Sequence, residues 1–192
     1  MSSSTTIALL PEAARAMSEV LSQVPGPSWY DPSPCHGWRV GDVANHVVAE
    51  HLWAPHLLRG ETLDQVGDRY AGDMLGADPV ASWRRAMTMS LMAWAQVDHD
   101  ARVHTGQGLI DVVEYAHQML LDLVVHAWDI AAGAGVSYAP VENAIEDAIA
   151  YEKPRVSAQG IPGVFGPPST YAGENRLGVL LAMTGRTPFR RG

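Results

Sequence analysis

Four polar side chains recur every four residues along one strongly apolar stretch of the chain. They are Glu114, Gln118, Asp122 and His126, and most of their neighbours are leucine, valine and alanine. Residues four apart lie on the same face of a helix, so these side chains form a polar stripe on an apolar helix. Burying polar groups without partners is unfavourable, so the stripe must be satisfied by protein groups or by a metal ion. Asp122 and His126 alone support a hydrogen-bonded pair and a metal site about equally.

A histidine elsewhere in the chain favours the metal. His46 lies in a second stretch with helical spacing and is flanked by Val43 and Val47. If the two helices face each other, His46, Asp122 and His126 supply two imidazoles and one carboxylate. Three such ligands leave an open coordination position for water or a thiolate. We expect a divalent metal, zinc in the first place, with nickel or iron as the alternatives.

Two glutamates are candidates for proton transfer beside this site. Glu50 lies one helical turn after His46, and Glu114 begins the polar stripe. We expect Glu50 or Glu114 to move a proton during catalysis. Glu50 could instead be an alternative ligand, a group that orients a ligand, or an ordinary carboxylate on the helix surface, and the sequence leaves these alternatives open.

Other residues near these motifs carry weaker expectations. Asp129 could accept a hydrogen bond from a ligand histidine, but a buried aspartate with ordinary partners is the simpler interpretation. Cys35 is the only cysteine, and no helix N-terminus or base is tied to it, so we expect no catalytic role. The other histidines are expected mostly at the surface or in loops: His36, His51, His56, His99, His104 and His117.

The elements that must position these residues follow from apolar periodicity and chain breakers. The spacing predicts helices over residues 11–24, 40–58, 79–97, 111–132, 140–151 and 174–183. Pro11 fits the first turn of the first helix, and Gly133 and Gly135 are expected to end the fourth. Residues 61–78 read as a loop with one helical turn, and residues 101–105 as extended chain.

Four long helices with short connections predict an all-α fold. We expect an antiparallel four-helix bundle with small C-terminal helical additions. The whole chain, residues 1–192, is interpreted as one domain, with a bundle core over about residues 6–135 and a C-terminal extension over 136–192.

Composition excludes several classes of protein. Hydrophobic residues make up 47% of the chain and charged residues 18%, as in a soluble globular protein. A formal net charge of -8 argues against a nucleic-acid partner, because phosphates are bound by basic surfaces. No signal peptide and no membrane-spanning run is apparent, and a single cysteine allows no intramolecular disulfide, so we expect a cytoplasmic protein with no membrane partner.

Three motifs in order carry a resemblance to a known family. They are PCHGWRVGDVANHVVAEH at residues 34–51, DLVVHAWDIA at 122–131 and RLGVLLAMTGRTP at 176–188. This pattern resembles the actinobacterial mycothiol-dependent maleylpyruvate isomerase group, within the DinB-like metal-binding four-helix bundles. The resemblance runs from Trp38 to Pro188.

The resemblance implies a divalent metal held by a histidine and a Glu-x3-His pair, which correspond here to His46, Asp122 and His126. It further implies isomerisation or S-transfer with mycothiol as the low-molecular-weight thiol, and association into a homodimer. The metal of such a site lowers the pKa of the thiol, by the same logic as metal-activated water.

Two departures from the isomerase pattern affect these expectations. Asp122 stands where the isomerase has glutamate, and it is one methylene shorter. The isomerase is also expected to carry an additional C-terminal domain, whereas only about 50 residues of this chain follow the helix with His126. Maleylpyruvate itself is therefore not the expected substrate.

The leading hypothesis is a metal-dependent thiol S-transferase or isomerase that uses mycothiol on a small electrophilic metabolite. The alternative is a non-enzymatic helical bundle that binds a small ligand or a structural metal. A third hypothesis is a metal-free bundle in which Asp122 pairs with His46 or His126.

Overall fold

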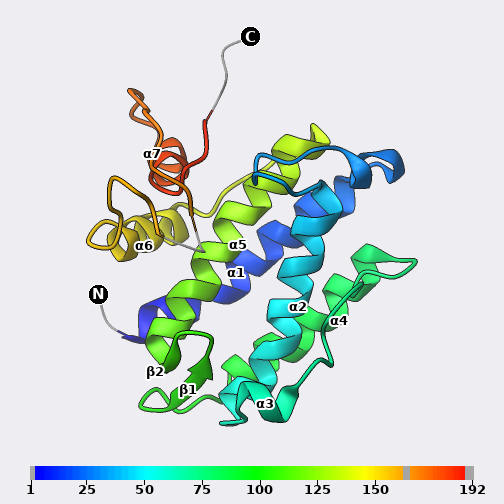
Figure 1. Ribbon diagram of the computed structural model, residues 1–192, viewed down its shortest axis with the longest axis vertical. Helices are drawn as coiled ribbons and strands as arrows, with labels where there is room; N and C mark the ends of the chain where they lie inside the picture. The colour runs from blue at the N-terminus through cyan, green and yellow to red at the C-terminus, as the bar shows by residue number, and fades with distance from the viewer. Residues whose placement is uncertain (1–2, 162–164, 189–192) are drawn as a thin grey trace.

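The computed structural model describes residues 3–161 and 165–188, and most of them are helical. Along the chain the elements are α1 (Ser3–Gln23), η1 (Gly26–Tyr30), α2 (Val40–Leu58), α3 (Leu63–Val66), α4 (Pro79–Trp94), β1 (Arg102–Thr105), β2 (Gly108–Asp111), α5 (Val112–Ala134), α6 (Glu142–Glu152) and α7 (Arg176–Met183) (Figure 1). The prediction of a mostly helical protein is confirmed, with one small two-stranded sheet added in the described residues.

The four long helices pack around a shared core. Helix α5 contacts α1 and α2, and α4 contacts the same two helices. Helix α6 packs on α5, α7 packs on α6, and Figure 1 shows this pair beside α5 on the side away from α4. Helix α5 thus joins the core of long helices to the C-terminal additions, and it carries the polar stripe.

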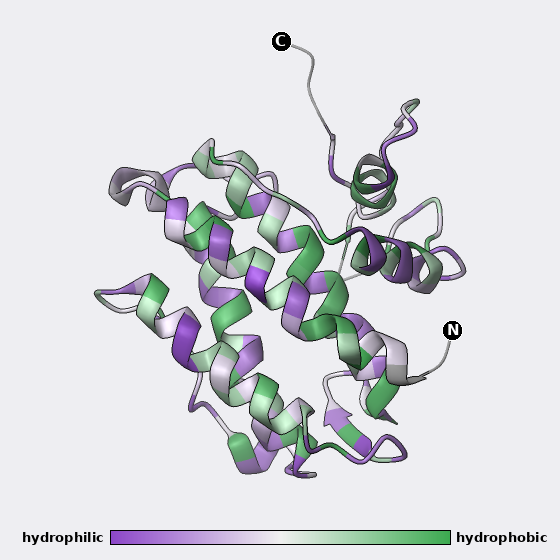
Figure 2. Cartoon of the chain, turned by 180° about the vertical axis from the view of Figure 1, so that it is seen from behind, coloured by the Kyte–Doolittle hydropathy of each residue, from purple (hydrophilic) through white to green (hydrophobic). Residues whose placement is uncertain are grey.

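The core explains why these stretches are helices. Each long helix buries apolar residues in the core, and Figure 2 shows hydrophobic and hydrophilic residues interspersed along the helices. The largest fully buried side chains include Trp83 of α4, Met17 of α1 and Leu120 of α5. No helix in the described part of the chain is long and apolar enough to cross a membrane.

The prediction that Gly133 ends α5 is wrong. Gly133 lies inside the helix, and Gly135 is the residue that ends it in a left-handed conformation, with φ of 66°. A Cβ atom at Gly133 would lie 2.7 Å from Cγ2 of Val40 and 3.0 Å from the carbonyl oxygen of Pro32. Gly133 therefore serves the close approach of α5 to the start of α2, which local sequence does not reveal.

The prediction that Pro11 opens the first helix is also wrong. Helix α1 begins at Ser3, and Pro11 lies inside it. Pro11 lacks the N–H that would donate to the carbonyl oxygen of Ile7, so α1 has one hydrogen bond fewer at this turn. Leu10 is buried in the core, and Thr6 donates a hydrogen bond of 3.0 Å to the buried Asp147 of α6.

Two smaller differences concern the segment between α4 and α5. Helix α4 ends at Trp94, three residues earlier than predicted. The extended conformation of residues 101–105 is confirmed by β1, but its antiparallel partner β2, with Val103 opposite Ile110, was not predicted. The hairpin leads directly into α5, whose first helical residue is Val112.

Candidate metal centre and cavity

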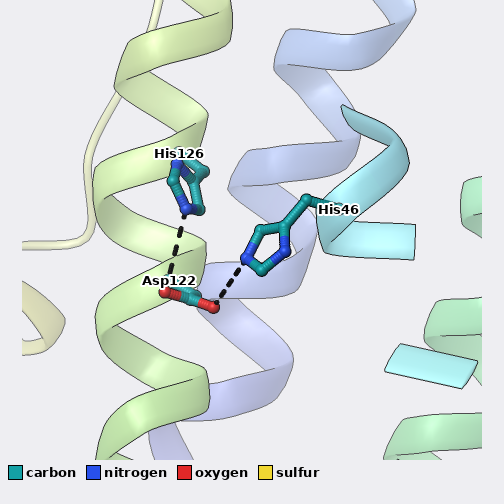
Figure 3. A group of neighbouring side chains, drawn as sticks. All are labelled: His46, Asp122 and His126. Carbon is teal, nitrogen blue, oxygen red and sulfur yellow. Dashed lines mark hydrogen bonds and ion pairs between the residues drawn. The ribbon is translucent and has the colours of Figure 1, made fainter. Parts of the chain in front are cut away.

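Helices α2 and α5 bring His46, Asp122 and His126 together (Figure 3). Nε2 of His46 lies 3.3 Å from Oδ2 of Asp122, and Nε2 of His126 lies 3.8 Å from Oδ1 of the same carboxylate. One ligand atom from each side chain lies within 4.8 Å of the others. The helical spacing places Asp122 and His126 on one face of α5, and the packing of α2 against α5 adds His46.

A buried ion pair supports His126 from behind. Oδ2 of Asp129 lies 2.9 Å from Nδ1 of His126 and accepts a 2.8 Å hydrogen bond from Nη2 of Arg186. Burial alone would raise the pKa of Asp129, but the hydrogen bond from His126 and the charge of Arg186 outweigh it, so the pKa is lowered. Asp129 is therefore ionised and can only accept, so the proton of a neutral His126 is on Nδ1.

This tautomer leaves two acceptors facing each other. Nε2 of His126 carries a lone pair, and it faces a carboxylate oxygen of Asp122 at 3.8 Å, too far for a hydrogen bond. The charge of Asp122 is itself favoured: burial would raise its pKa, but the hydrogen bond from His46 and the nearby histidines lower it. Asp122 and His126 thus present electron pairs to each other, and His46 could add a third once its Nε2 proton is released.

Aromatic and sulfur-bearing side chains cover this group on the α2 side. The ring centroid of Trp38 is 5.2 Å from that of His46 and 6.3 Å from that of His126. Cys35 lines the same cavity. Burial raises the pKa of the Cys35 thiol, and the charge of Asp129 adds to this. The expectation that Cys35 has no catalytic role stays a prediction.

The three side chains open into a cavity of about 640 Å³. Its wall holds the whole polar stripe, including Glu114 and Gln118, together with Glu50 of α2. Burial raises the pKa of Glu50, and the charge of Asp122 raises it further. Glu50 has no hydrogen-bond or ion-pair partner among the described residues, so it is free to exchange a proton with a ligand.

Glu114 is placed differently from Glu50. Its Oε1 accepts a 2.6 Å hydrogen bond from the hydroxyl of Tyr151, and its Oε2 accepts a 2.9 Å hydrogen bond from Nη2 of Arg155. The guanidinium of Arg155 also lies over the Tyr151 ring, 3.8 Å from its centroid. Both carboxylate oxygens of Glu114 are therefore engaged by residues of the C-terminal additions.

Several residues of the cavity were not singled out from the sequence. Tyr151, Glu152, Arg155 and Arg186 come from the segment after α5, and Tyr115 follows Glu114 on α5. Their placement depends on how α6 and α7 pack, and such packing produces no local pattern in the sequence. Asp129 is the exception, since the sequence offered it as an acceptor for a ligand histidine.

Four histidines expected mostly at the surface or in loops are at least partly buried, and His104 of β1 is one of them. His51 is 2% exposed and packs edge-on against Trp83, and burial lowers its pKa to about 4. His117 pairs at 2.9 Å with the buried Asp147. His56 hydrogen-bonds to Glu61 and Tyr70. Packing decides these positions, since α2 and α5 bury more than one face.

Comparison with known proteins places this geometry in a family. The family model described as mycothiol maleylpyruvate isomerase N-terminal domain matches residues 10–131, well over half of the chain. The chain belongs to this family. No match was found among curated proteins.

Two solved structures share the fold of this family member. One is a crystal structure of a histidine-to-alanine mutant of the mycothiol-dependent maleylpyruvate isomerase, with a TM-score of 0.69 and 15% sequence identity. The other is a crystal structure described as the mycothiol-dependent maleylpyruvate isomerase, with a TM-score of 0.63 and 16% identity. Each match covers 97% of this chain and 90% of the isomerase chain.

This coverage corrects one expectation from the sequence. The isomerase was expected to have an additional C-terminal domain without a counterpart here. The fold match instead extends over nine tenths of the isomerase chain, so α6 and α7 fall within the shared architecture. Chain length therefore gives no argument against the isomerase reaction.

Proposed function

We propose that this protein is a metal-dependent enzyme that uses a low-molecular-weight thiol, mycothiol in the first place. The enzyme either isomerises a small electrophilic metabolite or attaches the thiol to it through sulfur. His46, Asp122 and His126 are the proposed metal ligands. Membership of the isomerase family and the shared fold support the thiol. The metal is supported by the geometry of the three side chains.

The facing acceptors on His126 and Asp122 carry the metal proposal. Asp129 holds the proton of His126 on Nδ1, so the lone pair of Nε2 points toward an ionised carboxylate without a proton between them. A cation at this point removes the repulsion. A hydrogen-bonded, metal-free cluster accounts for the contact of His46 with Asp122, whereas a bound cation would account for both contacts of Asp122.

The separations also fit a metal. Zinc bonds of about 2.0–2.2 Å place tetrahedral ligand atoms roughly 3.3–3.6 Å apart. His46 lies 3.3 Å from Oδ2 of Asp122 and His126 lies 3.8 Å from Oδ1, and one ligand atom from each of the three lies within 4.8 Å of the others, so small side-chain shifts would bring them to this spacing. Two imidazoles and a carboxylate suit zinc, nickel or iron. A bound divalent metal would lower the pKa of a coordinated thiol, so that the thiolate forms near neutral pH.

The residues of the chain then have distinct roles. Glu50 lies in the cavity with a raised pKa and no partner among the described residues, so it is the proposed group that accepts and returns a proton. Glu114 is the weaker candidate, because Tyr151 and Arg155 already engage its oxygens. Trp38 lies against both histidines and restricts access of water from that side.

The test is elemental analysis of the purified protein after reconstitution with zinc, nickel or iron. We expect one equivalent of metal in the wild type and none in His46→Ala or His126→Ala. His99→Ala, an exposed histidine outside the cavity, is the matched control and should keep the metal. Stoichiometric metal in His126→Ala, or no metal in the wild type, would contradict the proposal.

Thiol binding separates the enzyme from a binding protein. Cobalt in the same site should give a sulfur-to-cobalt charge-transfer band when mycothiol is added. A metal that binds without any response to thiols would favour the non-enzymatic alternative, a bundle with a structural metal. Homodimer formation stays a prediction that sedimentation can check.

A further inference from the structure

Glu152, the last residue of α6, is a buried carboxylate without a partner. It is 2% exposed, and its Oε2 makes no hydrogen bond in the described residues. The side chain lines the same cavity as the three candidate metal ligands. Burial raises the pKa of this carboxyl group, and among the described residues no hydrogen-bond donor compensates its Oε2.

The cations that line the cavity are already engaged elsewhere. Arg155 binds Glu114 and the backbone oxygen of Tyr151. Arg186 binds Asp129 and the backbone oxygen of Thr184. Among the described residues, neither guanidinium contacts the Glu152 side chain.

Carboxylates outnumber cations along the cavity wall. Glu50, Glu114, Asp122 and Glu152 face two guanidinium groups, those of Arg155 and Arg186. A divalent metal at Asp122 would offset the excess only at its own end. At the end that contains Glu152, the carboxyl groups of Glu114 and Glu152 accompany a single guanidinium, that of Arg155, an arrangement that disfavours a further carboxylate and favours a cation.

We propose that the end of the cavity at Glu152 binds a protonated amine on the thiol or on the electrophile, and that it excludes carboxylates there. This inference rests on the proposed function, because it concerns the far end of a ligand held at the metal site. An ammonium group would donate a hydrogen bond to Oε2 of Glu152 and would supply a positive charge beside it, neither of which the described residues provide.

The helix sets the length of such a ligand. Glu114 contacts Tyr151, the neighbour of Glu152, and it precedes Asp122 by two helical turns. Eight residues at 1.5 Å per residue place Glu114 about 12 Å from Asp122 along α5, which sets the scale of the ligand. An amine close to the sulfur cannot reach Glu152, whereas one on a chain of six or more methylenes can.

The experiment uses the cobalt-loaded full chain and three series of alkanethiols that end in an amine, an alcohol or a carboxylate. Chain lengths run from two to ten methylenes, and affinity is read from the sulfur-to-cobalt band. With long chains, we expect the amine to bind about tenfold or more tightly than the alcohol, as for a hydrogen bond to a charged group. The carboxylate should bind more weakly than the alcohol, and the shortest chains should show no amine preference.

Glu152→Gln should abolish the amine preference while leaving the affinity of the long-chain alcohol unchanged. Glu142→Gln makes the same charge change at the exposed start of α6, outside this cavity, and should preserve the preference. Unchanged thermal melting checks that each variant is folded, and Glu152→Asp, which keeps the charge, should retain part of the preference.

Two failures are distinguishable. If no thiol of any series gives the band, the proposed function fails first. If thiols bind but amine, alcohol and carboxylate are equal at every length, or if the preference survives in Glu152→Gln, the amine site is refuted and the proposed function stands.

Discussion

Asp129→Asn tests whether the buried pair behind His126 holds the C-terminal segment to α5. Asp129 is fully buried and Arg186 is 6% exposed, and two hydrogen bonds of 2.8 Å and 3.3 Å join them. Asparagine keeps the shape but removes the charge, so a buried guanidinium loses its counter-ion. Breaking a buried pair on one side costs about 3–5 kcal/mol.

The size of this effect is measurable by thermal or urea unfolding. For a chain of this length, 1 kcal/mol shifts Tm by about 2–4 °C, so the expected drop in Tm is roughly 6–20 °C. Arg186→Met should destabilise by a comparable amount, because it leaves the Asp129 carboxylate buried without its guanidinium partner.

The double variant decides between a pair and two independent residues. The double variant Asp129→Asn with Arg186→Met removes both charges, so no buried charge is left without a counter-ion. Its loss of stability should be smaller than the sum of the losses in the two single variants by about 2–3 kcal/mol. Strict additivity would refute the reasoning. Glu146→Gln, which breaks the exposed pair with Arg176, is the control and should have a much smaller effect because solvent screens that pair.

Three further predictions concern the core. Below pH 6.5 the unfolded chain protonates His51 while the folded chain, with a pKa of about 4, does not, so stability should fall by up to about 3 kcal/mol as pH drops from 6.5 to 4. Urea titrations at pH 6.5 and pH 4 should show a smaller loss in the free energy of unfolding for His51→Phe than for the wild type, and an equal loss in the two proteins would contradict the role of His51. Gly133→Ala should destabilise by about 1–3 kcal/mol despite the better helix propensity of alanine, because the new methyl meets Val40 at 2.7 Å; a more stable variant would show that the α2–α5 contact relaxes freely. Tyr115→Phe should leave the melting temperature unchanged or raised, because the buried Tyr115 hydroxyl has no partner in the described residues, whereas Tyr138→Phe loses a bond to a backbone oxygen and about 1 kcal/mol; equal losses in both would overturn the distinction.

The candidate ligands show how much helical spacing in the sequence can predict. Asp122 and His126 were predicted on one face of α5 because the helical period fixes which residues share a face. His46 was added from the same reasoning on α2, and the structure places its Nε2 against Asp122. Their assignment as metal ligands stays a prediction until metal content is measured.

The errors have a common origin in packing. Gly133 and Pro11 were interpreted from local rules on helix ends, but the close contact with Val40 and the bond from Thr6 to Asp147 place both inside helices. His51 was expected at the surface because spacing alone does not show how many faces of α2 are covered.

The sequence by itself determined the helical class, the polar stripe and the shared face of Asp122 and His126, since these follow from a period of about four residues within single helices. The packing of α2 against α5 brought His46 to them. Tertiary structure alone decided which partner satisfies each polar group. Arg186 reaches Asp129 across 57 positions, and Arg155 reaches Glu114 across 41. Such pairs produce no periodic pattern in the sequence, because they depend on how α6, α7 and the segments around them pack against α5. Among the described residues, the same packing leaves Oε2 of Glu152 without a hydrogen-bond partner, and the proposed amine site rests on this carboxylate.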